Sequence, residues 1–229
     1  MIICFSGTDG AGKSTQIDAL RQRLASVDIR TEYVWARGGY TPVFVALKRL
    51  LHLLMGRRSN ETARSSSNAA YSARRSVALS KPWIARLWLI LAMLDLLMLY
   101  AVYVRCLSMR GRWVILDRYL IDTRIDFLRN HAYVFSEKSL LWRLVCWTAP
   151  KPHVHFLLTV PVAVSEARSR QKNEPYPDST ETLVFRLAAY EEFARDRGGA
   201  IVHLDGRESV EELFRQIDRH IPALTMVRS

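Results

Sequence analysis

A glycine-rich segment at residues 7–14, GTDGAGKS, constrains the fold of this chain more than any other feature. It has the spacing G-x-x-x-x-G-K-S, with an apolar run before it (MIICFS) and helical periodicity after it. Glycines let successive backbone N–H groups turn toward phosphate oxygens, and the following helix directs its positive end at the same anion. The segment therefore predicts a strand–loop–helix unit that binds nucleotide phosphates, a P-loop, in preference to a plain glycine turn.

Within this loop each residue type has an expected task. The lysine reaches the β- and γ-phosphates of ATP, and the serine hydroxyl ligates Mg²⁺. Lys13 is accordingly a candidate catalytic residue and Ser14 a candidate metal ligand. The candidates for contact with ATP are Gly7, Gly10, Ala11, Gly12, Lys13, Ser14 and Thr15.

Strand and helix patterns alternate along the rest of the chain. Short apolar, β-prone runs predict strands at 1–6, 31–35, 112–116, 154–160 and 200–204. Helical patterns are expected from Ser14 onward and at 43–55, 83–108, 139–147, 162–170, 180–197 and 210–221. This order predicts an α/β fold of the P-loop NTPase type, three α/β/α layers thick, with a five-stranded parallel sheet. Since no internal repeat or linker is visible, residues 1–229 are expected to form a single domain.

The long apolar pattern from Leu87 to Val104 is interrupted by one charge, Asp95, and approaches the length of a membrane span. A carboxylate near mid-span costs about 2.5–3.5 kcal/mol, and a single span would leave the flanking strands on opposite sides of a bilayer. We therefore expect a helix that is buried on most of its circumference.

Charge and cysteine content restrict the partners and the compartment. Of the net charge of +11, most lies between Lys48 and Arg86, where Glu61 is the only acid. Residues 41–81 are interpreted as a basic, partly flexible insert whose partner is solvent, an anionic substrate or an anionic membrane surface. No nucleic-acid-binding motif accompanies them, so we expect no nucleic-acid partner. Three cysteines without metal-ligand spacing, and an N-terminus without a basic leader, indicate a cytoplasmic protein.

Several motifs together resemble the thymidylate kinase family. Its P-loop typically reads G-x-D-G-x-G-K-S/T-T-Q, which residues 7–16 (GTDGAGKSTQ) match, and its D-R-Y matches residues 117–119. Residues 37–39 (RGG) are a weaker echo of its R-E-P-G-G, and residues 152–170 resemble its fourth strand and arginine-bearing lid. Arg186 and Tyr190 fall where the family's lid returns as an R-x-x-x-Y helix. The resemblance implies an enzyme that uses ATP and Mg²⁺ to phosphorylate a nucleoside monophosphate, foremost dTMP to dTDP.

The resemblance also implies roles for individual residues. Asp9 would bind a sugar hydroxyl of the acceptor, Arg118 its phosphate, and Asp117 would hold Mg²⁺ through water while serving catalysis. The loop holds no arginine at Gly10-Ala11, so the family pattern assigns the catalytic cations to a lid at 168–180. The implied catalytic lid residues are Arg168 and Arg170, and the further acceptor contacts are Arg37, Asp95 and Tyr119.

The acceptor side departs from the family pattern. Asp95 aligns with the aspartate of the family's A-D-R segment, but Leu96 stands where an arginine should grip the acceptor phosphate. Met98 stands where a glutamine should read the thymine ring. Three functions therefore stay open: a thymidylate kinase, a related enzyme acting on another phosphorylated, sugar or lipid acceptor, and an ATP-binding regulatory protein with little turnover. Family members commonly pair through helices that include the apolar one, so the resemblance also implies a homodimer.

Overall fold

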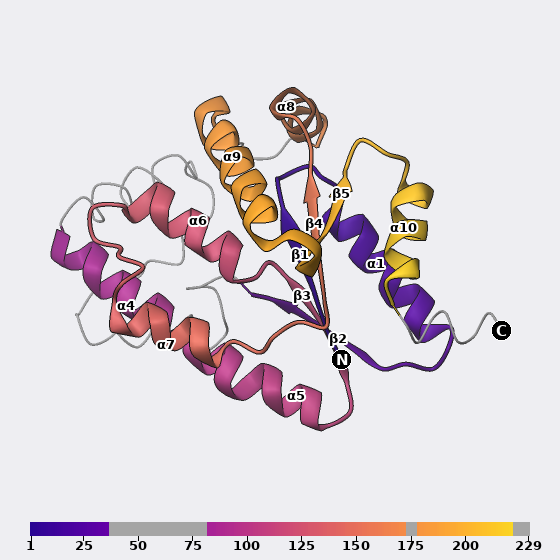
Figure 1. Ribbon diagram of the computed structural model, residues 1–229, viewed down its shortest axis with the longest axis horizontal. Coiled ribbons are helices and arrows are strands. Elements are labelled where there is room, and N and C mark those ends of the chain that lie inside the picture. The colour runs from indigo at the N-terminus through magenta and orange to yellow at the C-terminus, as the bar shows by residue number, and fades with distance from the viewer. Residues whose placement is uncertain (37–81, 173–177, 222–229) are drawn as a thin grey trace, which may run out of the picture.

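The computed structural model describes residues 1–36, 82–172 and 178–221, apart from the side chains of 197 and 198 (Figure 1). The strands are β1 (Ile2–Gly7), β2 (Thr31–Trp35), β3 (Trp113–Asp117), β4 (Val154–Thr159) and β5 (Val202–Asp205). The helices are α1 (Lys13–Ala25), α4 (Pro82–Met98), η1 (Leu99–Val104), α5 (Arg105–Met109), α6 (Leu120–His131), α7 (Leu140–Thr148), α8 (Val162–Gln171), α9 (Thr180–Arg197), η2 (Gly198–Ala200) and α10 (Val210–Arg219). The helix expected at 43–55, the insert at 41–81, Arg37 and residues 173–177 of the expected lid lie outside the described residues.

All five strands run parallel in the order β2-β3-β1-β4-β5. The predicted α/β class and five-stranded parallel sheet are confirmed, and each strand begins or ends within two residues of its predicted position. Because the strands are parallel, the loops that follow β1 and β3 leave the sheet at the same edge. Open α/β sheets bind their ligands at that edge, which places residues 8–12 and 118–119 next to each other there.

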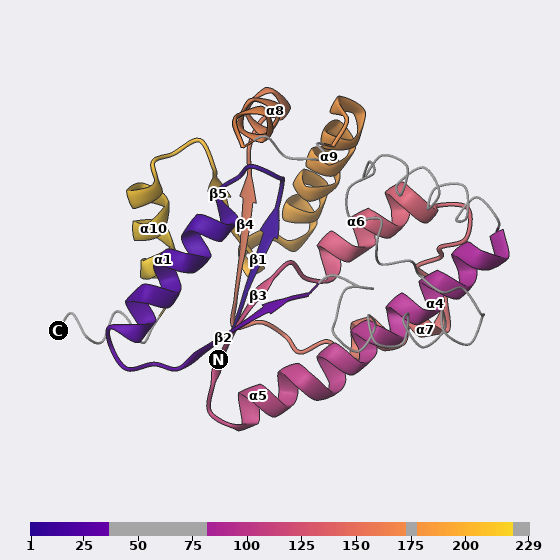
Figure 2. The ribbon, with the colours of Figure 1, turned by 180° about the vertical axis from the view of Figure 1, so that it is seen from behind.

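The two faces of the sheet are covered by different helices (Figures 1 and 2). Alternate residues of β1 point to opposite sides, as the period of a strand requires. Ile3 and Phe5 pack in a cluster with Leu20 of α1 and Ile217 of α10. Cys4 packs in a second cluster with Leu96 of α4 and Val145 of α7. The sheet is therefore buried on both faces, which is why its strands read as nearly continuous apolar runs.

The long apolar helix differs from its prediction. Pro82–Met109 is one 28-residue helix whose apolar window has a mean hydropathy of 2.2, and by length and composition alone it could cross a membrane. Only 44% of that window is buried. The expectation of burial on most of the circumference is therefore wrong: one side packs on the sheet, and the other presents a row of apolar side chains to the surface. A sequence that is apolar all round gives no sign of which side is covered.

Helix α6 was not expected from the sequence. Its buried residues include Asp122, Thr123, Asp126 and His131, so its inward face is largely polar. A helix with polar residues on both faces lacks the apolar stripe by which amphipathic helices are identified. The same buried polar residues make α6 important for the site.

Candidate active site

The loop after β1 has a backbone that requires glycine at its ends. Gly7 has φ +133°, and a Cβ built there would lie 1.7 Å from the Leu158 carbonyl oxygen of β4. The Thr8 N–H donates to that same oxygen at 3.1 Å, so the loop begins in contact with the neighbouring strand. Gly12, at φ +91°, turns the chain into α1. The glycines therefore fix the path of residues 7–12 over the carboxyl end of the sheet.

Lys13 closes this loop from inside. Its Nζ donates to the carbonyl oxygens of Gly7 at 2.9 Å and Thr8 at 2.7 Å, and the side chain is buried. Burial, and next the charge of Arg118, lower the pKa of the Lys13 ammonium to about 8, against the opposing effect of nearby carboxylates. The ammonium thus lies at the loop that would bind phosphate, and it is bonded there to backbone oxygens that a phosphate could replace.

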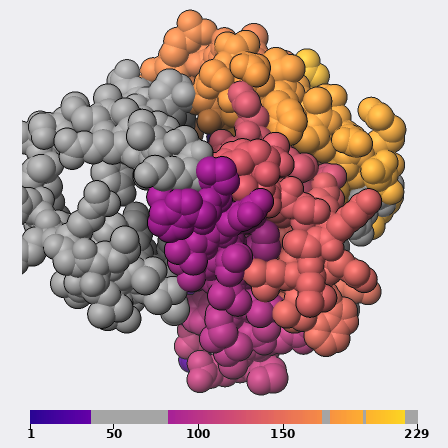
Figure 3. Space-filling view, turned by 90° about the vertical axis from the view of Figure 1, so that its left-hand side faces the viewer, coloured from indigo at the N-terminus to yellow at the C-terminus, as the bar shows by residue number. Residues whose placement is uncertain are grey.

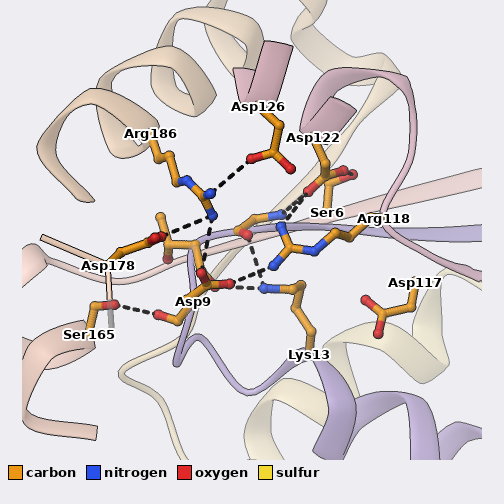
Figure 4. A network of polar contacts seen from close by, with 12 residues as sticks. Ser6, Asp9, Lys13, Asp117, Arg118, Asp122, Asp126, Ser165, Asp178 and Arg186 are labelled. Carbon is orange, nitrogen blue, oxygen red and sulfur yellow. Dashed lines mark hydrogen bonds and ion pairs between the residues drawn. The ribbon is translucent and has the colours of Figure 1, made fainter. Parts of the chain in front are cut away.

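Asp9, at the top of the loop, is held by two arginines from distant parts of the chain (Figure 4). Arg118 donates to its Oδ1 at 2.6 Å and Arg186 of α9 to its Oδ2 at 3.1 Å. Burial by itself would raise the pKa of the Asp9 carboxyl, but the charges of Arg118, Lys13 and Arg186 outweigh that effect and hold the pKa well below its usual range. Asp9 is therefore an ionised acceptor of fixed orientation.

Arg186 joins three elements at once. Its guanidinium lies 2.8 Å from the Asp126 carboxylate of α6 and 3.1 Å from that of Asp178, in addition to Asp9. Asp178 directly follows residues 173–177 of the expected lid. One buried cation thus connects the loop after β1, α6 and the chain that returns from the lid (Figure 4).

Asp122 of α6 is a buried carboxylate that contacts several residues beneath this site. It accepts hydrogen bonds from the Ser6 hydroxyl at 2.5 Å, the Tyr190 hydroxyl at 2.6 Å and the Tyr119 N–H at 2.8 Å. Arg118, whose φ is +74°, lies 3.6 Å from the same carboxylate. A buried carboxylate whose oxygens accept several hydrogen bonds holds its partners rigidly. Asp122 thereby fixes Arg118 in the orientation that reaches Asp9.

Asp117, at the end of β3, is bonded by a tyrosine from the next strand. The Tyr33 hydroxyl donates to Asp117 Oδ2 at 2.8 Å. The pairing of Tyr33 with Ile115 and of Trp35 with Asp117 places Tyr33 and Asp117 two residues apart diagonally, on one side of the sheet. Burial raises the pKa of the Tyr33 phenol, and its hydrogen bond to Asp117 raises it further, so the hydroxyl remains a donor.

Arg168 and Arg170, the two arginines expected to act from the lid, have different partners. Arg168 donates to the carbonyl oxygens of Gly10 at 2.7 Å and Gly206 at 2.9 Å, so it ties the loop after β1 to the turn after β5. The Arg170 side chain is 77% exposed and lies 3.6 Å from Glu166. Arg168 is therefore committed to the backbone, whereas Arg170 is in reach of solvent at the end of α8.

Two further predicted acceptor contacts, Tyr119 and Asp95, lie in the part of the chain that the structure describes. The Tyr119 hydroxyl donates to the Pro150 carbonyl oxygen at 2.7 Å, on the α7 side of the sheet. Asp95 is buried in α4, Leu96 is completely buried in the core, and Met98 is 54% exposed. Of the predicted side-chain contacts, the structure brings Asp9, Lys13, Asp117 and Arg118 together (Figure 4), and Arg168 bonds the same loop at Gly10.

Among models of protein families, the one described as Thymidylate kinase matches residues 5–217. The chain belongs to the thymidylate kinase family. No individual curated protein matches the chain. Membership confirms the resemblance read from the sequence and implies a phosphotransferase with a nucleotide substrate that uses ATP and Mg²⁺.

The site fits the two groups that thymidylate kinases use. For ATP, α1 begins after Gly12 without a side-chain cap and with no acidic residue in its first turn, as suits an anion at a helix N-terminus. For Mg²⁺, Ser14 and Asp117 offer oxygen ligands. Within the described residues, no group of three His, Cys, Asp or Glu side chains could hold a metal. Mg²⁺ is commonly held by one or two carboxylates together with substrate phosphates, so this donor set suits it.

Several residues of this candidate site were not found from the sequence. Asp122, Asp126, Asp178 and Tyr33 received no role there, and Arg186 was noted only as part of a motif. Asp122 and Asp126 are spaced i, i+4 on α6, just after the D-R-Y segment, which is the one signal that could have pointed to them. The contact of Tyr33 with Asp117 depends on the strand register, which the sequence leaves open.

Proposed function

We propose that this chain is an ATP- and Mg²⁺-dependent nucleoside-monophosphate kinase whose principal acceptor is dTMP. The observation that carries the proposal is the convergence of Lys13, Asp9 and Arg118 at one edge of the sheet in a chain of the thymidylate kinase family. Lys13 supplies a buried cation for the transferred phosphoryl group. Arg118 and the fixed carboxylate of Asp9 supply, respectively, a donor for the acceptor phosphate and an acceptor for a sugar hydroxyl.

The reaction in this proposal is an in-line displacement. An oxygen of the acceptor phosphate bonds to the γ-phosphorus of ATP as the bond to the β,γ-bridging oxygen breaks, giving ADP and the nucleoside diphosphate. The acceptor phosphate is largely ionised near neutral pH, so no general base is needed. Lys13 exchanges its hydrogen bonds to Gly7 and Thr8 for phosphate oxygens, and Arg170 is an exposed cation at the end of α8 that we assign to the transferred group.

Ser14 and Asp117 would hold the metal ion, with Tyr33 orienting the Asp117 carboxylate. A bound Mg²⁺ neutralises charge on the β- and γ-phosphates. The protein's own contribution is to place these oxygens at the carboxyl ends of β1 and β3 before any nucleotide arrives.

A second acceptor class is favoured by one observation. Leu96 stands where the family pattern has an arginine for the acceptor phosphate, and it is fully buried in the core of the protein. Leu96 packs in an apolar cluster, where a charged side chain is costly to bury unless it is paired. If the acceptor phosphate is bound by other groups, the enzyme could act on a different phosphorylated acceptor, such as another nucleoside monophosphate or a sugar or lipid phosphate.

The deciding experiment measures ADP release from Mg·ATP with dTMP, and separately with other nucleoside monophosphates and phosphorylated sugars. We expect strong stimulation by dTMP. The Lys13→Ala variant should lower turnover by at least about 100-fold, because it removes a cation from the transferred group. The matched control is Lys151→Ala, an exposed lysine before β4 that lies outside the site.

The outcomes separate the alternatives. Stimulation by another acceptor with dTMP silent would retain the kinase and replace its acceptor. Nucleotide binding without turnover on any acceptor would indicate a regulatory protein. Near wild-type turnover in Lys13→Ala would overturn the assignment of the loop itself.

A further inference from the structure

His155 of β4 is a buried histidine behind the candidate active site. Its ring is edge-on to the ring of Tyr119, with 5.8 Å between the centroids, and lies 6.0 Å from the ring of Phe193 on α9. Helices α6 and α9, which pack on this side of β1 and β4, lie against each other (Figure 3). The imidazole is therefore a polar group held between aromatic rings and the sheet.

The imidazole of His155 is bonded to a serine on the neighbouring strand. Its Nε2 lies 2.9 Å from Ser6 Oγ, and both side chains are buried. In the pairing of β1 with β4, His155 is opposite Cys4, so Ser6 is one diagonal step away on the same side of the sheet. The contact is thus set by the strand register, and it joins two residues 149 positions apart in the chain.

The hydroxyl of Ser6 fixes the direction of this bond. It donates to Asp122 Oδ2 at 2.5 Å. A serine hydroxyl has a single hydrogen, so an oxygen that donates to Asp122 can only accept from His155. The His155 Nε2 therefore carries a hydrogen and is the donor. A hydrogen-bond chain runs in one direction from His155 through Ser6 to Asp122.

The far end of this hydrogen-bond chain is Arg118. Asp122 Oδ1 lies 3.6 Å from one terminal nitrogen of the Arg118 guanidinium, and the other terminal nitrogen donates to Asp9 at 2.6 Å (Figure 4). The two oxygens of Asp122 belong to one planar group, so a rotation that follows a change at Oδ2 also moves Oδ1. Hydrogen bonds in a buried chain also polarise one another. The orientation of Arg118 therefore depends on a ring two hydrogen bonds beyond Asp122.

We propose that His155 is a positioning residue for the acceptor phosphate, which it serves by holding Arg118 in place through Ser6 and Asp122. The inference rests on the proposed function, in which Arg118 binds that phosphate. A serine hydroxyl rotates to suit its partners, and the donor from His155 occupies the oxygen so that the hydrogen points at Asp122. The imidazole thus acts on the binding of the acceptor and takes no part in the transfer itself.

The competing role for His155 is to fill the space between Tyr119 and Phe193. Phenylalanine would serve that role as well as histidine does, because it is also a flat ring of similar size. The positioning role needs a hydrogen on the nitrogen that faces Ser6. Phenylalanine lacks this donor, whereas the amide of glutamine retains one.

The test is steady-state kinetics of His155→Phe with the acceptor varied at saturating Mg·ATP. We expect the KM for dTMP to rise about three- to tenfold, because a hydrogen bond that orients Arg118 is lost, while kcat and the KM for ATP stay unchanged. His155→Gln should restore the wild-type KM for dTMP. The matched control His203→Phe removes a ring that is bonded to the Thr159 hydroxyl at 2.7 Å and should leave the KM for dTMP unchanged.

A double-mutant cycle shows whether the imidazole acts through Arg118. In an Arg118→Ala background, His155→Phe should cause no further rise in the KM for dTMP, since the group that it positions is absent. Ser6→Ala interrupts the same hydrogen-bond chain and should raise the KM as His155→Phe does. Circular dichroism and the melting temperature establish that each variant is folded, and Ser6→Ala carries the test if His155→Phe does not fold.

The hydrogen on Nε2 is measured without turnover, from the ring ¹⁵N shifts of His155 in the wild-type spectrum, assigned by their loss in His155→Phe. A hydrogen on Nδ1 alone overturns the proposal. So do an unchanged KM for dTMP in His155→Phe, no recovery in His155→Gln, or an equal rise of KM in the Arg118→Ala background. Wild-type turnover decides the proposed function separately: if another acceptor replaces dTMP, the same kinetics are run on it, and if none is turned over, both proposals fall.

Discussion

The guanidinium of Arg186 lies 3.1 Å from the carboxylate of Asp9, although 177 positions separate the two residues in the chain. The same guanidinium bonds Asp126 at 2.8 Å and lies 3.1 Å from Asp178. Three carboxylates from three segments would repel one another without this cation. Arg186 therefore stabilises both the fold around the site and the orientation of Asp9.

Replacement of Arg186 by alanine should be strongly destabilising. It removes the buried cation that Asp126, Asp178 and Asp9 share, and removing one partner of a buried ion pair costs about 3–5 kcal/mol. The measurement is the free energy of unfolding in urea. The control is Arg207→Ala, which removes an arginine paired with Asp205 but exposed to solvent, and which should leave that free energy unchanged. Equal effects of the two substitutions would show that the buried network contributes no more than a surface pair.

The sequence predicts what depends on local spacing and misses what depends on the assembled fold. The loop at Gly7–Ser14 and the parallel sheet follow from residues adjacent in the chain, since glycine spacing and apolar runs are local signals. The contact of Arg186 with Asp9 joins opposite ends of the chain. The hydrogen bond from Tyr33 to Asp117 depends on strand register, which no local pattern fixes.

The helices show the same division. Helix α6 was missed because its buried face carries Asp122, Thr123 and Asp126, whose burial is favourable only once partners such as Arg186 and Tyr190 are in place. The long helix was found from its apolar composition, but its exposed side was not. Which side is covered is decided by packing on the sheet and α7, which is tertiary information.

The pKa of Lys13 predicts a pH dependence of nucleotide binding. Its value of about 8 means that the ammonium becomes neutral as the pH rises through 8. Polyphosphate favours the charged form, so ATP affinity should fall above pH 8, and binding there should take up a proton. Titration calorimetry at one pH in two buffers of different ionisation enthalpy measures this uptake. The groups that also act on Lys13 are Arg118, Asp9, Asp122 and Asp117, and heats independent of the buffer would contradict the assignment.

The same shift has a consequence for stability. The folded pKa of about 8 is below the ordinary value of 10.5, so between these values the unfolded chain binds more protons than the native one. The contribution of Lys13 to stability is therefore unfavourable below pH 8 and is relieved as the pH rises toward 10.5. In Lys13→Met this rise should be lost, which comparison of urea unfolding at pH 7.5 and 9.5 would reveal. An unchanged slope in the variant would place the titration elsewhere.

Tyr33→Phe should weaken metal binding without removing a ligand. The hydroxyl holds Asp117 at 2.8 Å, and loss of such an outer-shell partner typically lowers metal affinity by about 10–100-fold. The measurement is Mn²⁺ binding in the presence of ATP, followed by electron paramagnetic resonance. Tyr103→Phe removes an exposed hydroxyl on η1 and is the control. Unchanged Mn²⁺ affinity in Tyr33→Phe would show that Asp117 needs no orientation or binds no metal.

Substitutions of Arg168 and Arg170, the two arginines of α8, should have different effects on stability and kinetics. Arg168 bonds the backbone oxygens of Gly10 and Gly206, so Arg168→Ala should lower the free energy of unfolding by about 1.5–3 kcal/mol and raise the KM for ATP as the loop loses its support. Arg170 is largely exposed, so Arg170→Ala should leave stability and the KM for ATP unchanged. Its kcat should nevertheless fall about 100-fold, because the transferred group loses a cation only in the transition state.

The control for both is Arg195→Ala, an exposed arginine on α9. Steady-state kinetics and thermal unfolding of the three variants separate the two roles, because a structural arginine changes KM and the melting temperature together and a transition-state arginine changes kcat alone. A wild-type kcat in Arg170→Ala would remove that residue from the chemistry. Loss of kcat without loss of stability in Arg168→Ala would instead mean that Arg168 leaves Gly10 and Gly206 when nucleotide binds, and that the lid acts through it.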